Sequence, residues 1–181
     1  CMLEAKMHEY NYFITLTYNQ ENVPCNKETG VLTLRKKDLQ DFLKRFRITW
    51  KRKVDEENIK YYACGEYGSQ TFRPHYHMIG FNLNIRDLEK LCLTKNGDQL
   101  YTSEWLTKIW GKGNVWIAEV NWNTCAYVSR YIMKKQKGPG SKEYYEELGI
   151  EPEFVVMSRR PGIGQKYFEE NKEKIYKYDD I

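Results

Sequence analysis

The sequence lacks the features that mark membrane-spanning and secreted proteins. Its 181 residues contain no run of 18 or more uncharged apolar residues, the length that a membrane span requires. The N-terminal stretch Cys1–Lys6 has no apolar segment of the kind found in signal peptides. We therefore expect a soluble protein that works inside the cell and has no membrane partner.

Paired cysteines are absent as well. The five cysteines are an odd number, they are scattered along the chain, and none belongs to a Cys-x-x-Cys pair. This pattern argues against a disulfide framework and against a zinc knuckle. We expect free thiols at Cys1, Cys25, Cys64, Cys92 and Cys125.

The composition predicts a folded core and an uneven surface charge. Hydrophobic residues make up 41% of the chain and charged residues 30%, which excludes a disordered protein. The net charge of +4 is below that of a non-specific nucleic-acid binder. However, residues 35–53 carry nine Lys or Arg against two Asp, and residues 124–142 carry five against no acid. Each run can be a solvated helix face or a surface that contacts phosphate.

The hydrophobic pattern predicts an α+β fold. Alternating apolar and β-branched residues indicate strands over 12–18, 59–67, 75–81, 113–120 and 154–157. Apolar residues with helical spacing indicate helices over 36–53, 86–93, 103–110, 123–137 and 165–176. This order predicts a ferredoxin-like, RRM-like core, with one antiparallel sheet of about five strands and helices packed mainly on one face.

Two histidines and a glutamate form the most informative local pattern. His75 and His77 lie two residues apart on a predicted strand, so their side chains point to one face. Glu66 lies near the end of the preceding strand, and an antiparallel hairpin can bring it opposite the histidines. Such a set can hold a metal with open coordination positions, whereas the alternative is two ordinary strand histidines. Ile79 and Phe81 share the histidine face, which indicates that the imidazoles border the core and need partners.

A second pattern lies on the predicted helix over 123–137. Tyr127, Tyr131 and Lys134 fall within about 60° of one another, so two phenols and one ammonium form a stripe. A phenol with a pKa near 10 is a poor nucleophile at neutral pH and needs a neighbouring cation. In a chain with 15 tyrosines, the stripe can also belong to a helix that only packs.

The order of these patterns resembles that of the HUH endonucleases, in which two histidines flank a bulky hydrophobic residue. Within that superfamily the sequence is most similar to the rolling-circle replication initiators of microviruses, of the gokushovirus type. Residues 13–18 resemble the first family motif, residues 73–77 with Glu66 the second, and residues 127–135 the third. Residues 158–164 also resemble a segment that these phage proteins share.

The resemblance implies a metal-dependent enzyme that nicks and rejoins single-stranded DNA. A tyrosine would attack the scissile phosphate and leave a 5′-phosphotyrosyl enzyme and a free 3′-hydroxyl. The Mg²⁺ or Mn²⁺ ligands would be Glu66, His75 and His77, and the catalytic residues Tyr127, Tyr131 and Lys134. The candidate DNA contacts are Thr15, Thr17, Arg73, Lys135, Arg159 and Arg160.

The resemblance also implies where the protein works and with what. We expect it to bind the single-stranded phage origin in the cytoplasm of the infected bacterium, to work with host replication proteins, and to act as a monomer. The cysteine-rich segment usual at the start of such phage proteins is missing. We therefore expect residues 1–181 to be a single nicking domain from a longer initiator.

Three alternatives remain open at this point. Plasmid relaxases share the HUH chemistry, but they place the tyrosine near the N-terminus and typically add a third metal-binding histidine. A non-enzymatic RNA-recognition module would bind nucleic acid on an aromatic sheet face, although no stretch here resembles its RNP1 pattern. A zinc hydrolase with two histidines and one glutamate would use water as the nucleophile and would form no covalent DNA adduct.

Overall fold

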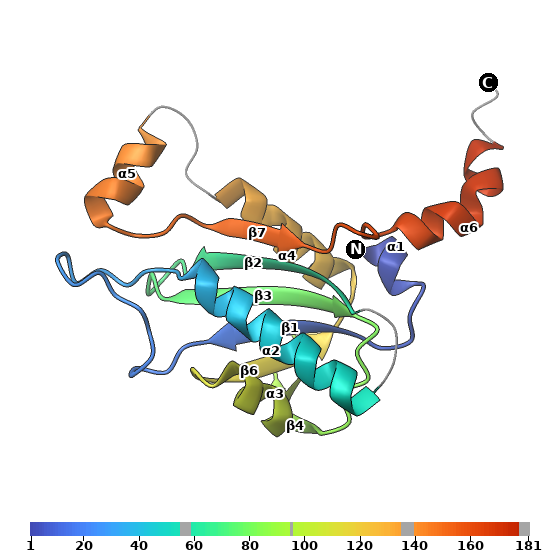
Figure 1. The fold of residues 1–181 in the computed structure, drawn as a ribbon, viewed down its shortest axis with the longest axis horizontal. Helices are drawn as coiled ribbons and strands as arrows, with labels where there is room; N and C mark the ends of the chain where they lie inside the picture. The colour runs from blue at the N-terminus through green and yellow to red at the C-terminus, as the bar shows by residue number, and fades with distance from the viewer. Residues whose placement is uncertain (55–58, 95, 135–139, 178–181) are drawn as a thin grey trace.

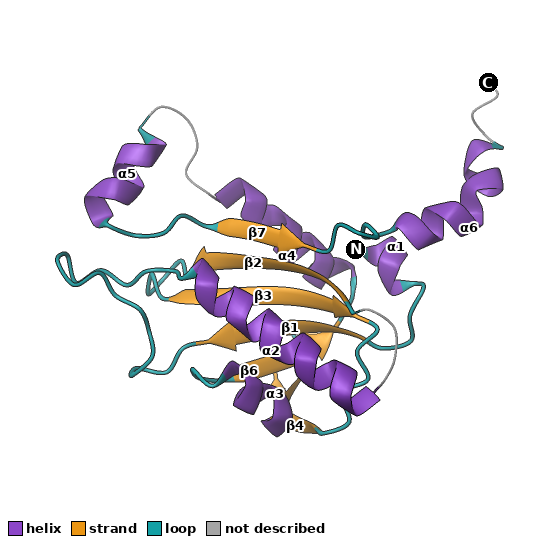
Figure 2. Cartoon of the chain, viewed as in Figure 1, coloured by secondary structure: helices purple, strands orange, loops and turns teal. Residues whose placement is uncertain are grey.

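A seven-stranded antiparallel sheet organises the chain (Figure 1). The computed structural model describes residues 1–54, 59–94, 96–134 and 140–177. The strands follow the order β4-β5-β6-β1-β3-β2-β7 across the sheet and are β1 (Asn11–Thr17), β2 (Lys60–Tyr67), β3 (Pro74–Phe81), β4 (Leu88–Leu93), β5 (Gln99–Ser103), β6 (Val115–Glu119) and β7 (Phe154–Met157). The helices, shown in Figure 2, are α1 (Met2–Ala5), α2 (Lys36–Val54), α3 (Glu104–Trp110), α4 (Trp122–Lys134), α5 (Ser141–Leu148) and α6 (Gln165–Tyr176).

The helix α2 covers one face of the sheet, with α3 beside it (Figure 1). Ile14 and Leu16 of β1 belong to the core on this face and are fully buried. The α2 side chains that pack into the same core follow helical spacing and are Leu39, Phe42, Phe46 and Trp50. Burial of each such side chain stabilises the fold by roughly 1.5–3 kcal/mol, so this layer is a main source of stability.

The helix α4 packs on the opposite face of the sheet. Its Cys125 and Val128 belong to a second core cluster with Tyr62, Ile79 and Phe81 of β2 and β3. The prediction that helices lie mainly on one face is therefore wrong. The physical reason is that β2 and β3 are buried along nearly their whole length, so apolar surface on both sides of the sheet requires a cover.

The prediction of a helix over 86–93 is also wrong. Strand β4 occupies residues 88–93 and pairs with β5, a strand that the sequence pattern did not reveal. Most of β4 is exposed, so its residues lack a buried alternation and its hydrogen bonds to β5 determine the structure. The turn closes with a hydrogen bond from the Thr94 amide to the Asp98 carbonyl oxygen at 2.8 Å. These strands raise the number from about five to seven, and the ferredoxin-like assignment is not confirmed.

The other predicted strands and helices are present. Their ends differ from the predicted ends by two residues at most, except that residues 135–137 of one predicted helix lie outside the described residues. The short helices α1 and α5 were not predicted. Among the described residues, every helix is too short or too polar to pass through a lipid bilayer.

A buried ion-pair network joins distant segments at one end of the sheet. Glu4 of α1 is fully buried, and its Oε1 lies 2.9 Å from Lys60 Nζ of β2 and 2.9 Å from His8 Nε2. The Gly164 amide, at the start of α6, donates to Glu4 Oε2 at 2.7 Å, and Lys60 also donates to the Gly162 carbonyl oxygen at 3.3 Å. Burial would raise the pKa of Glu4, but hydrogen bonds from His8, Gly164 and Lys60 outweigh burial and lower it. The network therefore holds the segment before α6 against α1 and β2.

We expect Glu4→Gln to lower the free energy of unfolding by about 3 kcal/mol, because Lys60 would stay buried without its carboxylate partner. The folded-state pKa of Glu4 lies below its ordinary value of 4.5, so its stabilisation is present above that pH and is lost as the pH falls through the lower folded value. Urea unfolding at neutral pH and at about pH 3 should therefore show a smaller difference between the two proteins in acid. Glu9→Gln, at an exposed position, should remain within about 0.5 kcal/mol of wild type. Equal unfolding midpoints for Glu4→Gln and wild type would contradict the role of the network.

Candidate active site

The register of β2 and β3 brings Glu66 directly opposite His75, as the sequence predicted. The loop between the strands closes with a hydrogen bond from the Gly68 amide to the Arg73 carbonyl oxygen at 3.0 Å. His77 lies two residues further along β3 and therefore projects to the same face as His75. Since paired residues of antiparallel strands share a face, all three side chains converge on the face that α4 covers.

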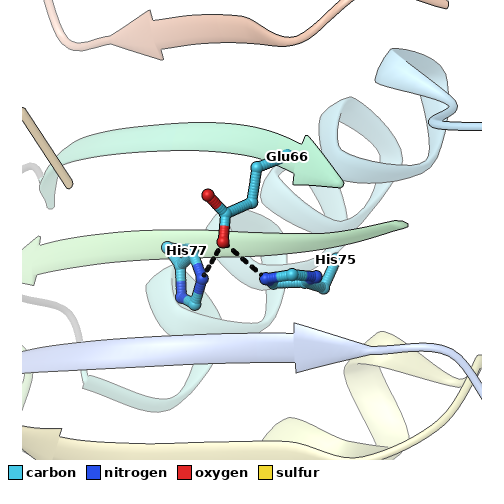
Figure 3. Close-up of side chains that lie close together, drawn as sticks. All are labelled: Glu66, His75 and His77. Atoms are coloured by element: carbon cyan, nitrogen blue, oxygen red, sulfur yellow. Dashed lines mark hydrogen bonds and ion pairs between the residues drawn. The ribbon is translucent and has the colours of Figure 1, made fainter. Parts of the chain in front are cut away.

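Both imidazoles point toward one carboxylate oxygen (Figure 3). Glu66 Oε1 lies 2.6 Å from His75 Nε2 and 3.2 Å from His77 Nε2. One ligand atom from each residue lies within 4.8 Å of the others, so the cluster can hold a metal ion. Glu66 and His77 are only 3% and 5% exposed, whereas His75 is partly exposed. The cluster is thus buried on one side and reaches solvent at His75.

The outer nitrogen of each imidazole has a partner of its own. His75 Nδ1 lies 3.0 Å from the Arg73 carbonyl oxygen, and His77 Nδ1 lies 3.0 Å from the Thr15 hydroxyl. A carbonyl oxygen only accepts, so this contact places a proton on His75 Nδ1. In the neutral ring, Nε2 then presents a lone pair to Glu66 Oε1, and two acceptors in contact require a second proton or a metal ion between them. Hydrogen bonds of this kind orient metal-binding histidines, so the arrangement fits a divalent cation.

The electrostatics of Glu66 favour a ligand over a proton donor. Burial would raise the pKa of its carboxyl group, but hydrogen bonds from His75 and His77 and their electrostatic attraction outweigh burial and lower the pKa to about 2. The carboxylate is therefore ionised at neutral pH. One carboxylate with two imidazoles is a donor set that divalent metals accept, which is compatible with the predicted Mn²⁺ or Mg²⁺.

Tyr127 brings a phenol to the cluster. Its hydroxyl lies 3.5 Å from Glu66 Oε1, and 42% of the residue is exposed. Tyr131 and Lys134 lie one and two turns further along α4, but their side chains are outside the described part of the structure. Lys135 lies outside the described residues altogether. The structure thus brings one of the two predicted tyrosines to the predicted metal ligands.

The two threonines that were predicted to contact DNA lie on the site face of β1. Thr15 is 9% exposed and its hydroxyl contacts His77, which favours support of the metal cluster over a contact with DNA. Thr17 pairs with His75 in the register, and its hydroxyl donates to the Asn114 carbonyl oxygen at 3.3 Å. The two side chains therefore have different partners although they lie on one strand and one face.

The three predicted arginine contacts lie in two separate places. Arg73 borders the site, and its guanidinium donates to the Tyr18 carbonyl oxygen at 3.0 Å. Arg159 and Arg160 are exposed, and the residue before them is hydrogen-bonded to Tyr61 of β2. Tyr61 precedes the glutamate of the cluster by five residues, or about 16 Å of extended strand. These two arginines are therefore at the far end of β2 from the cluster.

Two aromatic residues at the site were not identified from the sequence. The Phe13 ring stacks on the His77 ring with 5.2 Å between centroids and meets the Tyr127 ring edge-on at 6.0 Å. Trp116 of β6 pairs with Thr15 and is 42% exposed on the same face. The alternation along β1 already placed Phe13 on the face of Thr15, but nothing local indicates that β6 pairs beside it.

Comparisons with known proteins give a consistent result. A family model for replication-associated proteins of the ORF2 type matches residues 11–136. Replication-associated protein ORF2 of Spiroplasma virus 4 is 39% identical over 180 residues, which cover 99% of this chain and 54% of that protein. Replication-associated protein VP4 of Bdellovibrio phage phiMH2K is 32% identical, with 96% of this chain and 52% of that protein covered.

A third relative is more distant in coverage. Replication-associated protein ORF4 of Chlamydia phage 1 is 33% identical over 140 residues, which cover 74% of this chain and 33% of that protein. The chain spans about half the length of the first two relatives. No solved structure matches the chain.

We expect Thr15→Val to weaken binding of Mn²⁺ about 10- to 100-fold, because His77 would lose the hydroxyl that orients it. Thr17→Val is the matched control, since it makes the same change on the same face but removes a contact to Asn114. Isothermal titration with Mn²⁺ would compare the two variants with wild type. Equal affinities for all three proteins would show that Thr15 does not support a metal site.

Proposed function

The chain belongs to the family of ORF2-type replication-associated proteins, and we propose that it is a metal-dependent endonuclease that nicks and rejoins single-stranded DNA at a phage replication origin. The family membership agrees with the resemblance to microvirus replication proteins that the motifs indicated. The proposed products are a 5′-phosphotyrosyl enzyme and a free 3′-hydroxyl, which can prime rolling-circle synthesis.

The position of the Tyr127 hydroxyl carries this proposal. It lies 3.5 Å from the same carboxylate oxygen that His75 and His77 contact, so a phenol and three ligand residues meet at one point. A tyrosine with a purely structural role would bury its ring, yet Tyr127 is 42% exposed beside a largely buried cluster. A phenol that a polymeric substrate can reach, next to a cation site, supports attack on a phosphodiester.

The cluster residues divide the work between binding and orientation. Glu66, His75 and His77 would hold Mn²⁺ or Mg²⁺, which when bound polarises a phosphoryl oxygen and stabilises negative charge at the reacting phosphate. Glu66, with a pKa of about 2, serves as an anionic ligand rather than as a general acid. The Thr15 hydroxyl and the Arg73 carbonyl oxygen hold the two imidazoles in orientation.

The proposed reaction exchanges one phosphodiester for another. The phenolic oxygen of Tyr127 or Tyr131 forms a bond to phosphorus, and the bond from phosphorus to the 3′ oxygen breaks. The phenolic proton leaves the tyrosine, and the departing 3′ oxygen takes up a proton to become the free hydroxyl. Because the bond energy is kept in the phosphotyrosine, attack by a 3′-hydroxyl reverses the step and joins DNA ends without ATP.

Two tyrosines four residues apart on α4 suit a repeated cycle. Residues at this spacing lie one helical turn apart on the same side of a helix. While Tyr127 or Tyr131 carries the DNA, the other can attack the regenerated origin. Lys134, at the end of α4, would offset negative charge on the reacting phosphate, an effect worth about 10² to 10³ in rate.

The proposed setting is the cytoplasm of an infected bacterium, where the domain would act as a monomer beside host replication proteins. Its partner is the single-stranded phage origin. Arg73 and Lys135 would contact phosphates near the nick. Arg159 and Arg160, at the far end of β2, would contact DNA that lies away from it.

Replacement of both tyrosines should abolish the covalent DNA adduct. The double change Tyr127→Phe, Tyr131→Phe removes both proposed nucleophilic oxygens, whereas each single change should leave part of the labelling. A denaturing gel of protein mixed with a labelled random pool of single-stranded DNA and Mn²⁺ measures the adduct. Tyr176→Phe, an exposed position on α6, should label like wild type. Labelling of the double variant would place the nucleophile elsewhere.

Removal of the metal site should reduce nicking at least about 100-fold, since the reacting phosphate would lose its main source of charge stabilisation. The same gel measures this loss with EDTA or with His75→Ala. His8→Gln is the control, because His8 contacts Glu4 outside the cluster. Undiminished cutting by His75→Ala would refute the metal role. Metal-dependent cleavage that never yields an adduct would indicate water as the nucleophile, as in a zinc hydrolase.

A further inference from the structure

A cavity of about 250 Å³ lies on the same face of the sheet as the metal cluster. Phe13 and Ala118 are direct partners in the pairing of β1 with β6, so both side chains project to this face. The cavity is lined by apolar side chains of three strands and by polar side chains from the β4–β5 turn and the start of α4, among them Phe13, Leu100, Ala118, Asp98, Gln99 and Asn123.

Phe13 connects this cavity to the candidate active site. Its ring stacks on His77 at 5.2 Å and meets the ring of Tyr127 at 6.0 Å. The same side chain also lines the cavity. One aromatic ring therefore separates the cavity from the proposed nucleophile and from a proposed metal ligand.

The size and the lining of the cavity fit one planar heterocycle. Its volume of about 250 Å³ is below the roughly 300–1,000 Å³ of pockets that hold drug-sized ligands. Apolar contacts combined with amide and carboxylate groups are the means by which proteins bind unstacked bases of single strands. Asn121 and Thr124 are committed to the start of α4, because the Thr124 amide donates to Asn121 Oδ1 at 2.9 Å. Asn123 is exposed at the same helix start, and its amide offers both a donor and an acceptor.

We propose that this cavity receives one nucleobase of the single-stranded DNA, close to the phosphate that the tyrosine attacks, and thereby gives the nick its sequence specificity. The substrate class rests on the proposed function. Insertion of a base costs little here because an unpaired strand has no partner base to give up. The polar lining then discriminates among bases by the edge that each base presents.

Two exposed tryptophans extend the aromatic surface around the cavity. Trp116 lies two residues before Ala118 on the same face of β6 and is 42% exposed. Trp122, next to Asn123 in the sequence, is 72% exposed. Stacking on exposed aromatic rings is largely independent of base identity. Neighbouring bases can therefore stack outside while the base in the cavity is read.

The test separates base reading from nicking. The double variant Tyr127→Phe, Tyr131→Phe would be immobilised and incubated with a random pool of single-stranded DNA and Mn²⁺, and the retained strands would be sequenced. We expect an enriched base at several positions. In the same background, Asn123→Ala should lower the preference at one position about tenfold and leave the other positions unchanged. Ala118→Leu, which adds bulk to the cavity, should remove the preference at that same position.

Asn96→Ala is the matched control, because Asn96 is exposed in the β4–β5 turn and does not line the cavity. It should retain every preference. Circular dichroism would report a failure of Ala118→Leu to fold, and the exposed Asn123→Ala would then decide the outcome. Retained strands without any preferred base, or preferences that Asn123→Ala leaves unchanged at every position, would overturn the proposal.

Nicking would be measured separately, with the intact tyrosines on the selected sequence. Base preferences that respond to Asn123→Ala without any nicking would reject the proposed function and keep the base-binding cavity. Nicking whose sequence preference is unaffected by both cavity variants would reject the cavity and keep the proposed function.

Discussion

The pairing of Glu66 with His75 across β2 and β3 is the constraint on which the candidate site depends. Because side chains alternate along a strand, a slip of one residue would turn the carboxylate to the α2 face and separate it from both imidazoles. Tyr76, between the two histidines, helps to fix this alignment from the other side of the sheet. It is fully buried, and its hydroxyl lies 2.7 Å from that of Tyr18 and donates to the Arg35 carbonyl oxygen at 2.9 Å. The hydrophobic residue of the motif therefore anchors the strand that presents the histidines.

The second requirement is a helix on the site face of the sheet. The helix α4 is held there by Cys125 and Val128, which pack on the apolar surface of β2 and β3. Tyr127 precedes Val128 by one position, so it lies about 100° around the helix from that anchor. This offset lets the phenol reach the carboxylate while part of its ring stays accessible. Apolar packing on one side of α4 thus sets the position of a reactive group on another.

Local rules account for what could be predicted from the sequence. The metal cluster follows from the two-residue spacing of the histidines and from a hairpin between adjacent strands, and the tyrosine follows from helical spacing and family resemblance. The supporting residues depend on long-range pairing: Thr15 and His77 are 62 residues apart, and Trp116 joins the site only through the pairing of β6 with β1. The face that α4 covers and the exposed strand β4 likewise depend on tertiary contacts, which outweigh local preference.

The composition of the cluster also sets a charge balance. Two neutral imidazoles and one carboxylate sum to −1, so a bound divalent cation would bring the total to +1. A single phosphodiester, with one negative charge, would then make the assembly neutral in a place where Glu66 and His77 are almost shielded from water. The strand before cleavage and the phosphotyrosine after it are both singly charged diesters. Such a site would hold them with similar strength, which is the electrostatic condition for a reversible transfer.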